Sequence, residues 1–322
     1  MEIRKIDPNV VSELSLESVL SELNVTPYNH SLNSFDEEKA KMGQDLILKG
    51  RTIRNGKKSK LISSFFVCTD CHNLGREFDN LSSQKASERL EFSKNNYIPF
   101  LPGSTFYGIY NRTSFYNDDY IKKYGDLVTN ARDTLENSVQ LCAKYCSSGR
   151  YLADWELEAI MHYYKKNELK IKDLNLDEQT LESIVNLKRI NDDEKTDLLA
   201  ILNRSHVNGY NAKFLSTMDV NKRKYGKGGN VENGKLIYNK SCLHCHANKR
   251  VTYLNLGNDK LSGKMFVKNL KGYRDKSLYQ IIRYGTYAKF GRKQYMPMYT
   301  EQKMSDDQLN DLVAYIKQLA EK

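Results

Sequence analysis

The chain of 322 residues lacks long hydrophobic runs. No stretch reaches the roughly 18 apolar residues that a helix needs to cross a bilayer, so the sequence predicts no membrane span. The first residues, Met1-Glu2-Ile3-Arg4-Lys5, contain no apolar core of a signal peptide. Apolar residues make up only 39% of the chain, and its mean hydropathy is −0.67. This is little material for the core of a chain whose length suggests two domains plus connecting structure.

The balance of charge is basic, with a formal net charge of +10 and an isoelectric point of about 9.1. Such a surface attracts nucleic acid, anionic lipid, an acidic redox partner or a small anionic substrate. The sequence contains no nucleic-acid-binding motif, so we do not expect nucleic acid as a partner.

Cysteine is also scarce, and four of the six cysteines belong to two copies of one motif. The copies are Cys68-Thr69-Asp70-Cys71-His72 and Cys242-Leu243-His244-Cys245-His246. Cys-X-X-Cys-His is the attachment signature of c-type haem, in which the thiols bond the haem vinyl groups and the histidine binds the iron. We therefore expect two covalently bound haem c groups. Their attachment residues are Cys68, Cys71, Cys242 and Cys245, and their proximal iron ligands are His72 and His246.

Two porphyrins add apolar surface and so compensate for the low hydrophobic content. Covalent haem attachment in bacteria takes place outside the cytoplasm. We therefore expect a periplasmic protein whose natural leader has been removed ahead of Met1.

The second half of the chain predicts a run of helices around its haem motif. Residues 234–238 form a short amphipathic helix before the motif, and residues 277–285 have helical periodicity with a glycine stop. Ser305 is a good N-cap with Gln308 three residues later, which predicts a capping box and a closing helix. A Met-Pro pair, Met296-Pro297, lies between these helices. This order resembles class I cytochrome c.

The first half repeats the plan. Residues 43–47 predict an N-terminal helix, followed by a basic stretch and the first haem motif. An offset of 152 residues aligns its closing helix with that of the second half, so that Asp154 meets Asp306 and Leu157 meets Leu309. The segment between motif and closing helix is roughly 20 residues longer in the first half, which is room for something besides electron transfer.

The expected fold is therefore mainly α, with two class I cytochrome c-like domains that each carry one covalent haem c. Residues 1–40 are an N-terminal extension with a surface helix over 10–23, and 41–166 are the first domain. Residues 167–230 are a charged connector with short helices over 177–187 and 192–203 and an exposed basic linker over 222–229. Residues 231–322 are the second domain.

The distal ligand of each haem iron indicates whether that haem only transfers electrons or also takes part in a reaction with a substrate. Met296 occupies the expected loop of the second domain, and a His/Met haem has the raised potential of an electron carrier. Met298 and Met304 are alternatives, and Lys293 is a rival ligand. The offset maps Met296 onto Lys144, which is flanked by Cys142 and Cys146.

A thiolate from this pair would give the first haem a low potential and place a nucleophilic sulfur beside it. Alternatively, Cys142 and Cys146 form a disulfide, although their spacing of four residues suits one poorly, or are buried thiols. His30 and His162 are rival ligands.

Residues 40–165 resemble the catalytic domain of bacterial thiosulfate dehydrogenases, dihaem cytochromes that interconvert thiosulfate and tetrathionate. The shared features are residues 43–47, a haem motif followed by Leu74 and Gly75, and Thr134-Leu135-Glu136 six residues before Cys142. Gly149, Leu152 and the helix that ends at 159–163 complete the likeness. The A subunit of sulfur-oxidising haem complexes shares the His/Cys design, and residues 230–320 resemble class I cytochrome c.

The resemblance implies that Cys142 is both distal ligand and catalytic sulfur. Cys142 would leave the iron and bond a sulfane sulfur, and a second thiosulfate would release tetrathionate. Electrons would pass from the His72/Cys142 haem to the His246/Met296 haem and on to an external carrier such as a cytochrome. Members of this family carry arginines four residues before and three after the cysteine, where this chain has Ser138 and Tyr145. Arg112, Arg132 and Arg150 are the candidate replacements for binding the anion, with Lys144 adjacent, and Cys146 stands where the family has serine.

The expected function is that of an oxidoreductase on small sulfur anions. A non-enzymatic dihaem electron-transfer protein is the alternative. A dihaem peroxidase, which needs an open haem and an acid-base residue, is a third and weaker option.

Overall fold

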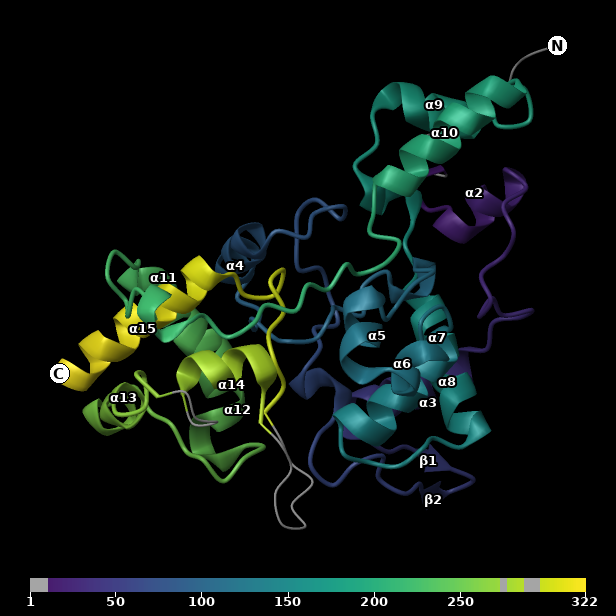
Figure 1. Cartoon of the computed structure of the whole chain (residues 1–322). Coiled ribbons are helices and arrows are strands. Elements are labelled where there is room, and N and C mark those ends of the chain that lie inside the picture. The colour runs from purple at the N-terminus through teal and green to yellow at the C-terminus, as the bar shows by residue number, and fades with distance from the viewer. Residues whose placement is uncertain (1–10, 273–276, 287–295) are drawn as a thin grey trace.

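The computed structural model describes residues 11–272, 277–286 and 296–322. The chain is mainly helical, with 51% of residues in helices and 3% in strands, in agreement with the expected mainly-α class. None of the helices within these three ranges has the length and apolar character needed to cross a bilayer. Figure 1 shows most of the early helices on one side of the molecule and the C-terminal helices, joined by the early helix α4 (Ala86–Asn95), on the other.

The first group of helices surrounds the crossing of α3 (Glu37–Lys49) and α8 (Asp154–Lys166). A Cβ on Gly43 would lie 2.0 Å from the carbonyl oxygen of Ala159, so only glycine lets the two helices approach this closely. The crossing buries Leu46, Ile47 and Ile160. The other elements of this group are the hairpin β1 (Ile53–Arg54) and β2 (Lys57–Lys58), and α5 (Asp118–Tyr124), α6 (Asp126–Thr129) and α7 (Leu135–Leu141).

The second group surrounds the crossing of α11 (Val231–Ile237) and α15 (Asp306–Glu321). Its close contact is Gly234, where a Cβ would lie 2.0 Å from the carbonyl oxygen of Asp311. Asp311 is the residue that the offset of 152 aligns with Ala159, so the aligned positions contact glycines in corresponding helices. Ser305 makes the expected capping box with Gln308. The group also contains α12 (Leu243–His246), α13 (Lys260–Val267) and α14 (Leu278–Tyr284).

A third, smaller core joins the segment near the N-terminus to the connector between the two groups of helices. Helix α2 (Leu16–Glu22) packs with α9 (Glu178–Val185) and α10 (Asp192–Arg204) through Leu16, Ile184 and Leu202. The two short helices expected in the connector are therefore present. The helix expected over residues 10–23 is interrupted: residues 11 and 12 are helical, and after a break over 13–15 a new helix begins at Leu16, where the Ser15 side chain caps it.

The stretch 222–229 is only in part the exposed linker that its glycines and lysines predict: Lys222, Lys224 and Lys227 are exposed, but the segment is anchored between them. Arg223 is buried and donates to the carbonyl oxygens of Met218, Leu270 and Gly272. Gly226 lies against the backbone of α15 at Ala314. The segment therefore packs on the second group, because the backbone carbonyls of folded segments satisfy its guanidinium.

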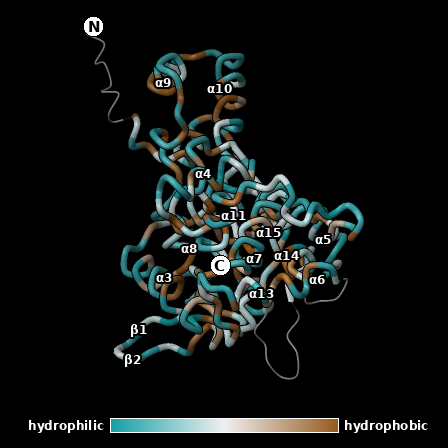
Figure 2. The backbone as a smooth tube through the Cα atoms, turned by 90° about the vertical axis from the view of Figure 1, so that its left-hand side faces the viewer, coloured by the Kyte–Doolittle hydropathy of each residue, from teal (hydrophilic) through white to brown (hydrophobic). Residues whose placement is uncertain are grey.

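The longer loop of the first half packs against the second half. It contains α4 (Ala86–Asn95), which lies near α11 and α15 in Figures 1 and 2. Leu90 of α4 and Phe100 after it belong to the same buried cluster as Ile237 and Leu312. Tyr299 and Ser241 both donate to the carbonyl oxygen of Phe100. The extra residues thus build the contact between the two groups of helices.

Candidate functional site

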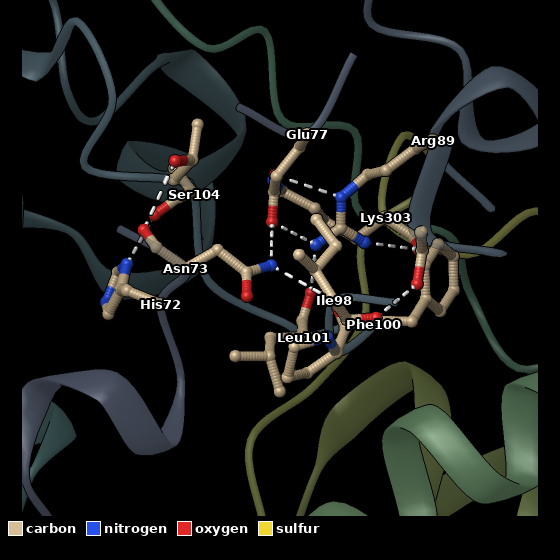
Figure 3. A network of polar contacts seen from close by, with 12 residues as sticks. His72, Asn73, Glu77, Arg89, Ile98, Phe100, Leu101, Ser104 and Lys303 are labelled. Carbon is tan, nitrogen blue, oxygen red and sulfur yellow. Dashed lines mark hydrogen bonds and ion pairs between the residues drawn. The ribbon is translucent and has the colours of Figure 1, made fainter. Parts of the chain in front are cut away.

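The first Cys-X-X-Cys-His motif begins with a short 3-10 turn over Cys68–Asp70. The Asp70 carboxylate accepts the Val67 N–H at 2.8 Å, which fixes the start of the turn. His72 Nδ1 lies 2.6 Å from the Ser104 carbonyl oxygen, a contact drawn in Figure 3. A carbonyl oxygen can only accept, so the proton is on Nδ1, and the Nε2 lone pair is left to bind a metal. Phe106 stacks on the ring with centroids 4.6 Å apart.

Gly103 lets the chain pass close enough to the first motif for the Ser104 carbonyl oxygen to reach His72 Nδ1. A Cβ at position 103 would lie 2.5 Å from the Cys71 carbonyl oxygen and 2.7 Å from the His72 ring. No other residue fits this gap without moving the motif.

The second motif repeats the arrangement in a different local fold. A π-helical turn over Tyr238–Cys242 leads into α12, which ends at His246. His246 Nδ1 lies 3.1 Å from the Leu254 carbonyl oxygen. Burial lowers the pKa of His72 to about 4 and also lowers the pKa of His246. Both imidazoles are therefore neutral at pH 7, which is the form that binds iron.

The two motifs meet across the boundary between the helix groups. Arg250 Nη2 lies 2.6 Å from Asp70 Oδ1, and Cys245 Sγ lies 3.9 Å from the Asp70 carbonyl oxygen. His244 hydrogen-bonds the backbone of Thr69. The sequence does not reveal this contact, because residues 70 and 250 have no local relation.

Cys142 and Cys146 lie on one face of a π-helical turn, Cys142–Cys146, that directly follows α7. The Ser147 N–H donates to the Cys142 carbonyl oxygen at 2.8 Å, which is the five-residue bond that defines such a turn. The two thiols hydrogen-bond each other, and this bond together with burial raises the pKa of Cys142 well above its usual value. Cys142 is close enough to Cys68 and Cys71 for their charges to affect its pKa. The structure thus brings the cysteine pair to the first haem motif.

The surroundings of this thiol pair are aromatic. Cys146 belongs to a small apolar cluster with Val128, Leu141, Tyr116 and Tyr120. The Tyr116 hydroxyl hydrogen-bonds Cys146, and the Tyr116 and Tyr120 rings meet edge to face with centroids 4.8 Å apart. These tyrosines are site residues that sequence reasoning missed, because nothing in their spacing relates them to Cys146.

The three candidate arginines have partners elsewhere. Arg112 is buried against the Tyr210 ring and donates to the carbonyl oxygens of Thr105 and Tyr107. Arg132 pairs with Asp118 at 2.7 Å. Arg150 makes a two-pronged pair with Glu156 at 2.6 and 2.7 Å. Among the contacts of the described residues, none joins these guanidinium groups to Cys142.

The two positions that replace the arginines of the resembling family differ in exposure. Ser138 is buried and donates to the Ala131 and Thr134 carbonyl oxygens at 2.7 and 2.9 Å. Tyr145 is 46% exposed and meets the Tyr151 ring. The space around Ser138 is thus closed, whereas Tyr145 borders solvent.

The rival histidines are also engaged. His30 Nε2 lies 2.7 Å from the Tyr110 carbonyl oxygen, and His162 Nδ1 accepts the Asp36 N–H at 3.2 Å. Each interaction occupies one ring nitrogen in a buried setting, as expected of structural histidines.

The methionines near the second motif have different surroundings. Met304 is fully buried in the core. Met298 Sδ accepts from Lys123 Nζ at 3.2 Å and lies 3.9 Å from the Tyr124 hydroxyl. Met296 packs against the cluster that contains Cys242 and is tied to Thr286 by two hydrogen bonds. Met296 therefore stays the predicted ligand; Lys293 lies outside the described residues.

A buried ion cluster joins the two groups of helices beside the first motif (Figure 3). Glu77 pairs with Arg89 at 2.6 Å and with Lys303 at 3.1 Å, and all three are almost fully buried. Burial alone would raise the pKa of Glu77, but the charges of Arg89 and Lys303 outweigh it and hold the pKa well below its usual value. Asn73, next to His72, donates to Glu77 at 2.8 Å. Sequence reasoning missed this cluster as well.

Both motifs fit covalent haem on the evidence of their own atoms. Each offers two cysteines held as thiols and a histidine whose Nδ1 is bound to a carbonyl, which leaves Nε2 for the iron. Gly103 packs against the ring of the first of these histidines without a side chain in the way.

Comparison with known proteins agrees for the second motif. Residues 229–316 match the family model described as cytochrome C oxidase, cbb3-type, subunit III. No curated protein and no solved structure matches the chain. The matched residues contain the second haem motif and the crossing of α11 with α15. This part of the chain is a cytochrome c domain, which implies covalently bound haem c and haem-based electron transfer.

Proposed function

We propose that this chain is a dihaem c-type cytochrome that acts as an oxidoreductase on small sulfur anions and interconverts thiosulfate and tetrathionate. Haem 1 is held by Cys68, Cys71 and His72 in a first domain over 41–166. Haem 2 is held by Cys242, Cys245 and His246 in a second domain over 231–322. When bound, these groups supply one-electron transfer.

The observation that carries the proposal is the position of Cys142. It lies close to Cys68 and Cys71 on a partly buried π-helical turn, and such turns are frequent at functional sites. In a plain electron carrier the same thiol would serve only as a structural or potential-lowering ligand. The resemblance to thiosulfate dehydrogenases points to the same cysteine.

The residues have distinct roles in this reaction. Cys142 would bind the iron of haem 1 and, when free, would be the nucleophile that bonds a sulfane sulfur. Ser104 and Leu254 orient His72 and His246 through their carbonyl oxygens. Arg250 and Asp70 hold the two haem motifs in contact, which supports transfer of electrons from the first site to the second. Met296 is the distal ligand of haem 2.

Cytochrome c domains are typically extracytoplasmic, and we propose a periplasmic location for this protein. The electrons pass from haem 2 to an external carrier such as a cytochrome. The basic charge of the chain suits an acidic carrier and anionic substrates alike.

A non-enzymatic dihaem electron-transfer protein is the second candidate. It is favoured by the engagement of Arg112, Arg132 and Arg150 with other partners. An unpaired sulfonate in a closed pocket costs several kcal/mol, so an enzyme needs a cation or a solvated opening there. The exposed side of the turn at Tyr145 is the place for such an opening, with Lys144 beside it.

The test uses the haem-loaded full chain with thiosulfate and an oxidised carrier, or with tetrathionate and a reduced one. We expect turnover in at least one direction and a low-spin thiolate signal in the electron paramagnetic resonance spectrum. Cys142→Ala loses both, whereas Ser147→Ala, on the same turn, keeps both. If the intact protein exchanges electrons with carriers but reacts with neither anion, the carrier function replaces the enzymatic one.

A further inference from the structure

The second thiol of the pair, Cys146, has no role in the reaction proposed for Cys142. It follows Cys142 by four residues on the π-helical turn, and the two side chains hydrogen-bond each other. The Tyr116 hydroxyl also hydrogen-bonds Cys146. Its position also affects the pKa of Cys71, so it lies within the same group of sulfur atoms as Cys142. The structure holds both side chains as thiols.

We propose that Cys146 is a resolving thiol, which attacks the sulfur adduct on Cys142 and closes a reversible Cys142–Cys146 disulfide. The inference rests on the proposed reaction with sulfur anions and adds a step to it. With this step the two thiols would together exchange two electrons, whereas each haem c group would transfer one.

The bonds and electrons balance in the reducing direction. The Cys142 thiolate attacks an inner sulfur of tetrathionate, the central S–S bond breaks, and one thiosulfate leaves with its electron pair. Cys142 then carries an –S–SO₃⁻ group. Cys146 attacks Cys142 Sγ, a Sγ–Sγ bond forms, and the second thiosulfate leaves with the electron pair of the broken bond. The proton of Cys146 passes to the Tyr116 hydroxyl and on to water.

The return step uses the haem groups as reductant. Two electrons, which two haem c groups would supply when bound and reduced, and one proton would convert the disulfide back to the Cys142 thiolate and the Cys146 thiol. A disulfide between residues four apart on one helical turn is strained, and strained disulfides are readily reduced. The spacing that is poor for a structural disulfide is therefore suited to a transient one.

The direct contact of the two thiols favours resolution over release. Because the two thiols lie on one π-helical turn and hydrogen-bond each other, the attack has the advantage of an intramolecular reaction. Attack of a second thiosulfate on the adduct would only form tetrathionate again and reverse the first step. Attack by Cys146 instead releases the second thiosulfate and carries the reduction forward.

The experiment is a single turnover on the haem-loaded full chain, with thiols reduced and haems oxidised. Tetrathionate is added, the reaction is quenched with an alkylating reagent, and the peptide that contains residues 142 and 146 is identified by mass. We expect the Cys142–Cys146 disulfide in the wild type and its loss in Cys146→Ser, where the adduct on Cys142 accumulates instead. Ser147→Ala serves as the matched control and forms the disulfide like the wild type.

The outcomes separate the two proposals. An adduct on Cys142 that persists in the wild type without conversion to a disulfide overturns the resolving role and leaves the proposed function standing. No adduct, no disulfide and no turnover with either anion in any variant overturns both. Because the readout is a covalent mass, it does not depend on the rate of electron transfer through the haems.

Discussion

Arg250 Nη2 lies 2.6 Å from Asp70 Oδ1 and thereby links the loop after the second haem motif to the interior of the first. Asp70 is buried, whereas the Arg250 side chain is 42% exposed. The same carboxylate accepts the Val67 N–H that starts the first motif. One side chain therefore stabilises both the local turn and the contact between the motifs.

We expect the two partners to contribute unequally to stability. Arg250→Ala should lower the free energy of unfolding by no more than about 1 kcal/mol, because a half-exposed ion pair is screened by solvent. Asp70→Ala should cost about 1–2 kcal/mol more, because it also leaves the Val67 N–H without its acceptor. Denaturant unfolding of the haem-loaded protein measures both. Equal losses would show that the bond to Val67 contributes nothing.

Gly103→Ala should disturb the first haem site. The new Cβ would lie 2.5 Å from the Cys71 carbonyl oxygen and 2.7 Å from the His72 ring, and overpacking of this kind costs about 1–3 kcal/mol. We expect reduced haem content and loss of the normal spectrum of one haem. Gly75→Ala is the matched control, because no atom lies within 4 Å of the Cβ it would add. Equal haem content in the two variants would contradict this account of Gly103.

The intact protein should carry two covalent haem groups. The mass of the denatured chain should exceed the mass of the sequence by two haem groups, because each motif presents two thiols and one carbonyl-bound histidine. Replacing Cys68 and Cys71 by serine should leave one group, and the same change at Cys242 and Cys245 should leave the other. A wild-type mass with a single addition would remove one of the proposed sites.

Met296→Ala should abolish the methionine-to-iron charge-transfer band of the oxidised protein, because this band depends on the bond between the methionine sulfur and the iron. We propose that Met296 makes this bond in haem 2, which would then have the raised potential of a His/Met pair. Met298→Leu is the control and should keep the band, because Met298 Sδ already has Lys123 and Tyr124 as partners. Absorption spectra of the two variants decide the assignment. Loss of the band in Met298→Leu alone would transfer the ligand role to Met298.

Glu77 should make the free energy of unfolding depend on pH in the acidic range. Its pKa in the folded chain lies below the ordinary value of 4.5, so its contribution is complete above that pH and is lost as the pH falls. Glu77→Gln should remove this part of the pH dependence and cost about 3–5 kcal/mol at pH 7, because Arg89 stays buried without its counter-charge. Denaturant unfolding between pH 3 and about 7 measures the effect.

Lys303→Met is the comparison variant for this cluster. Burial lowers the pKa of Lys303 to about 7 despite the neighbouring Glu77, so a neutral side chain of similar volume is tolerated there. It keeps the pair of Glu77 with Arg89 and should therefore cost less than Glu77→Gln. The reverse order would mean that Lys303, and not Arg89, is the main partner of Glu77.

Local features of the fold could be predicted from the sequence. The cap at Ser305 and the start of α15 follow from a short pattern, and the alignment of Asp154 with Asp306 matches the first residues of α8 and α15. Segment 222–229 could not be read in this way, because its composition does not reveal the carbonyl oxygens that bind Arg223. Helical caps depend on neighbours in sequence, whereas the burial of a charge depends on its partners in space.

The sequence by itself determined that the chain carries two Cys-X-X-Cys-His motifs, and their spacing alone predicts haem attachment, because this needs only two thiols and a histidine at fixed positions. The tertiary structure decided what surrounds them. Only the folded chain brings Asp70 to Arg250, Glu77 to Lys303 and Cys142 to the first motif. It also gave Arg112, Arg132 and Arg150 partners other than the cysteine. These contacts join residues far apart in the chain, and only the packing of the helix groups fixes which charges and thiols come within bonding distance.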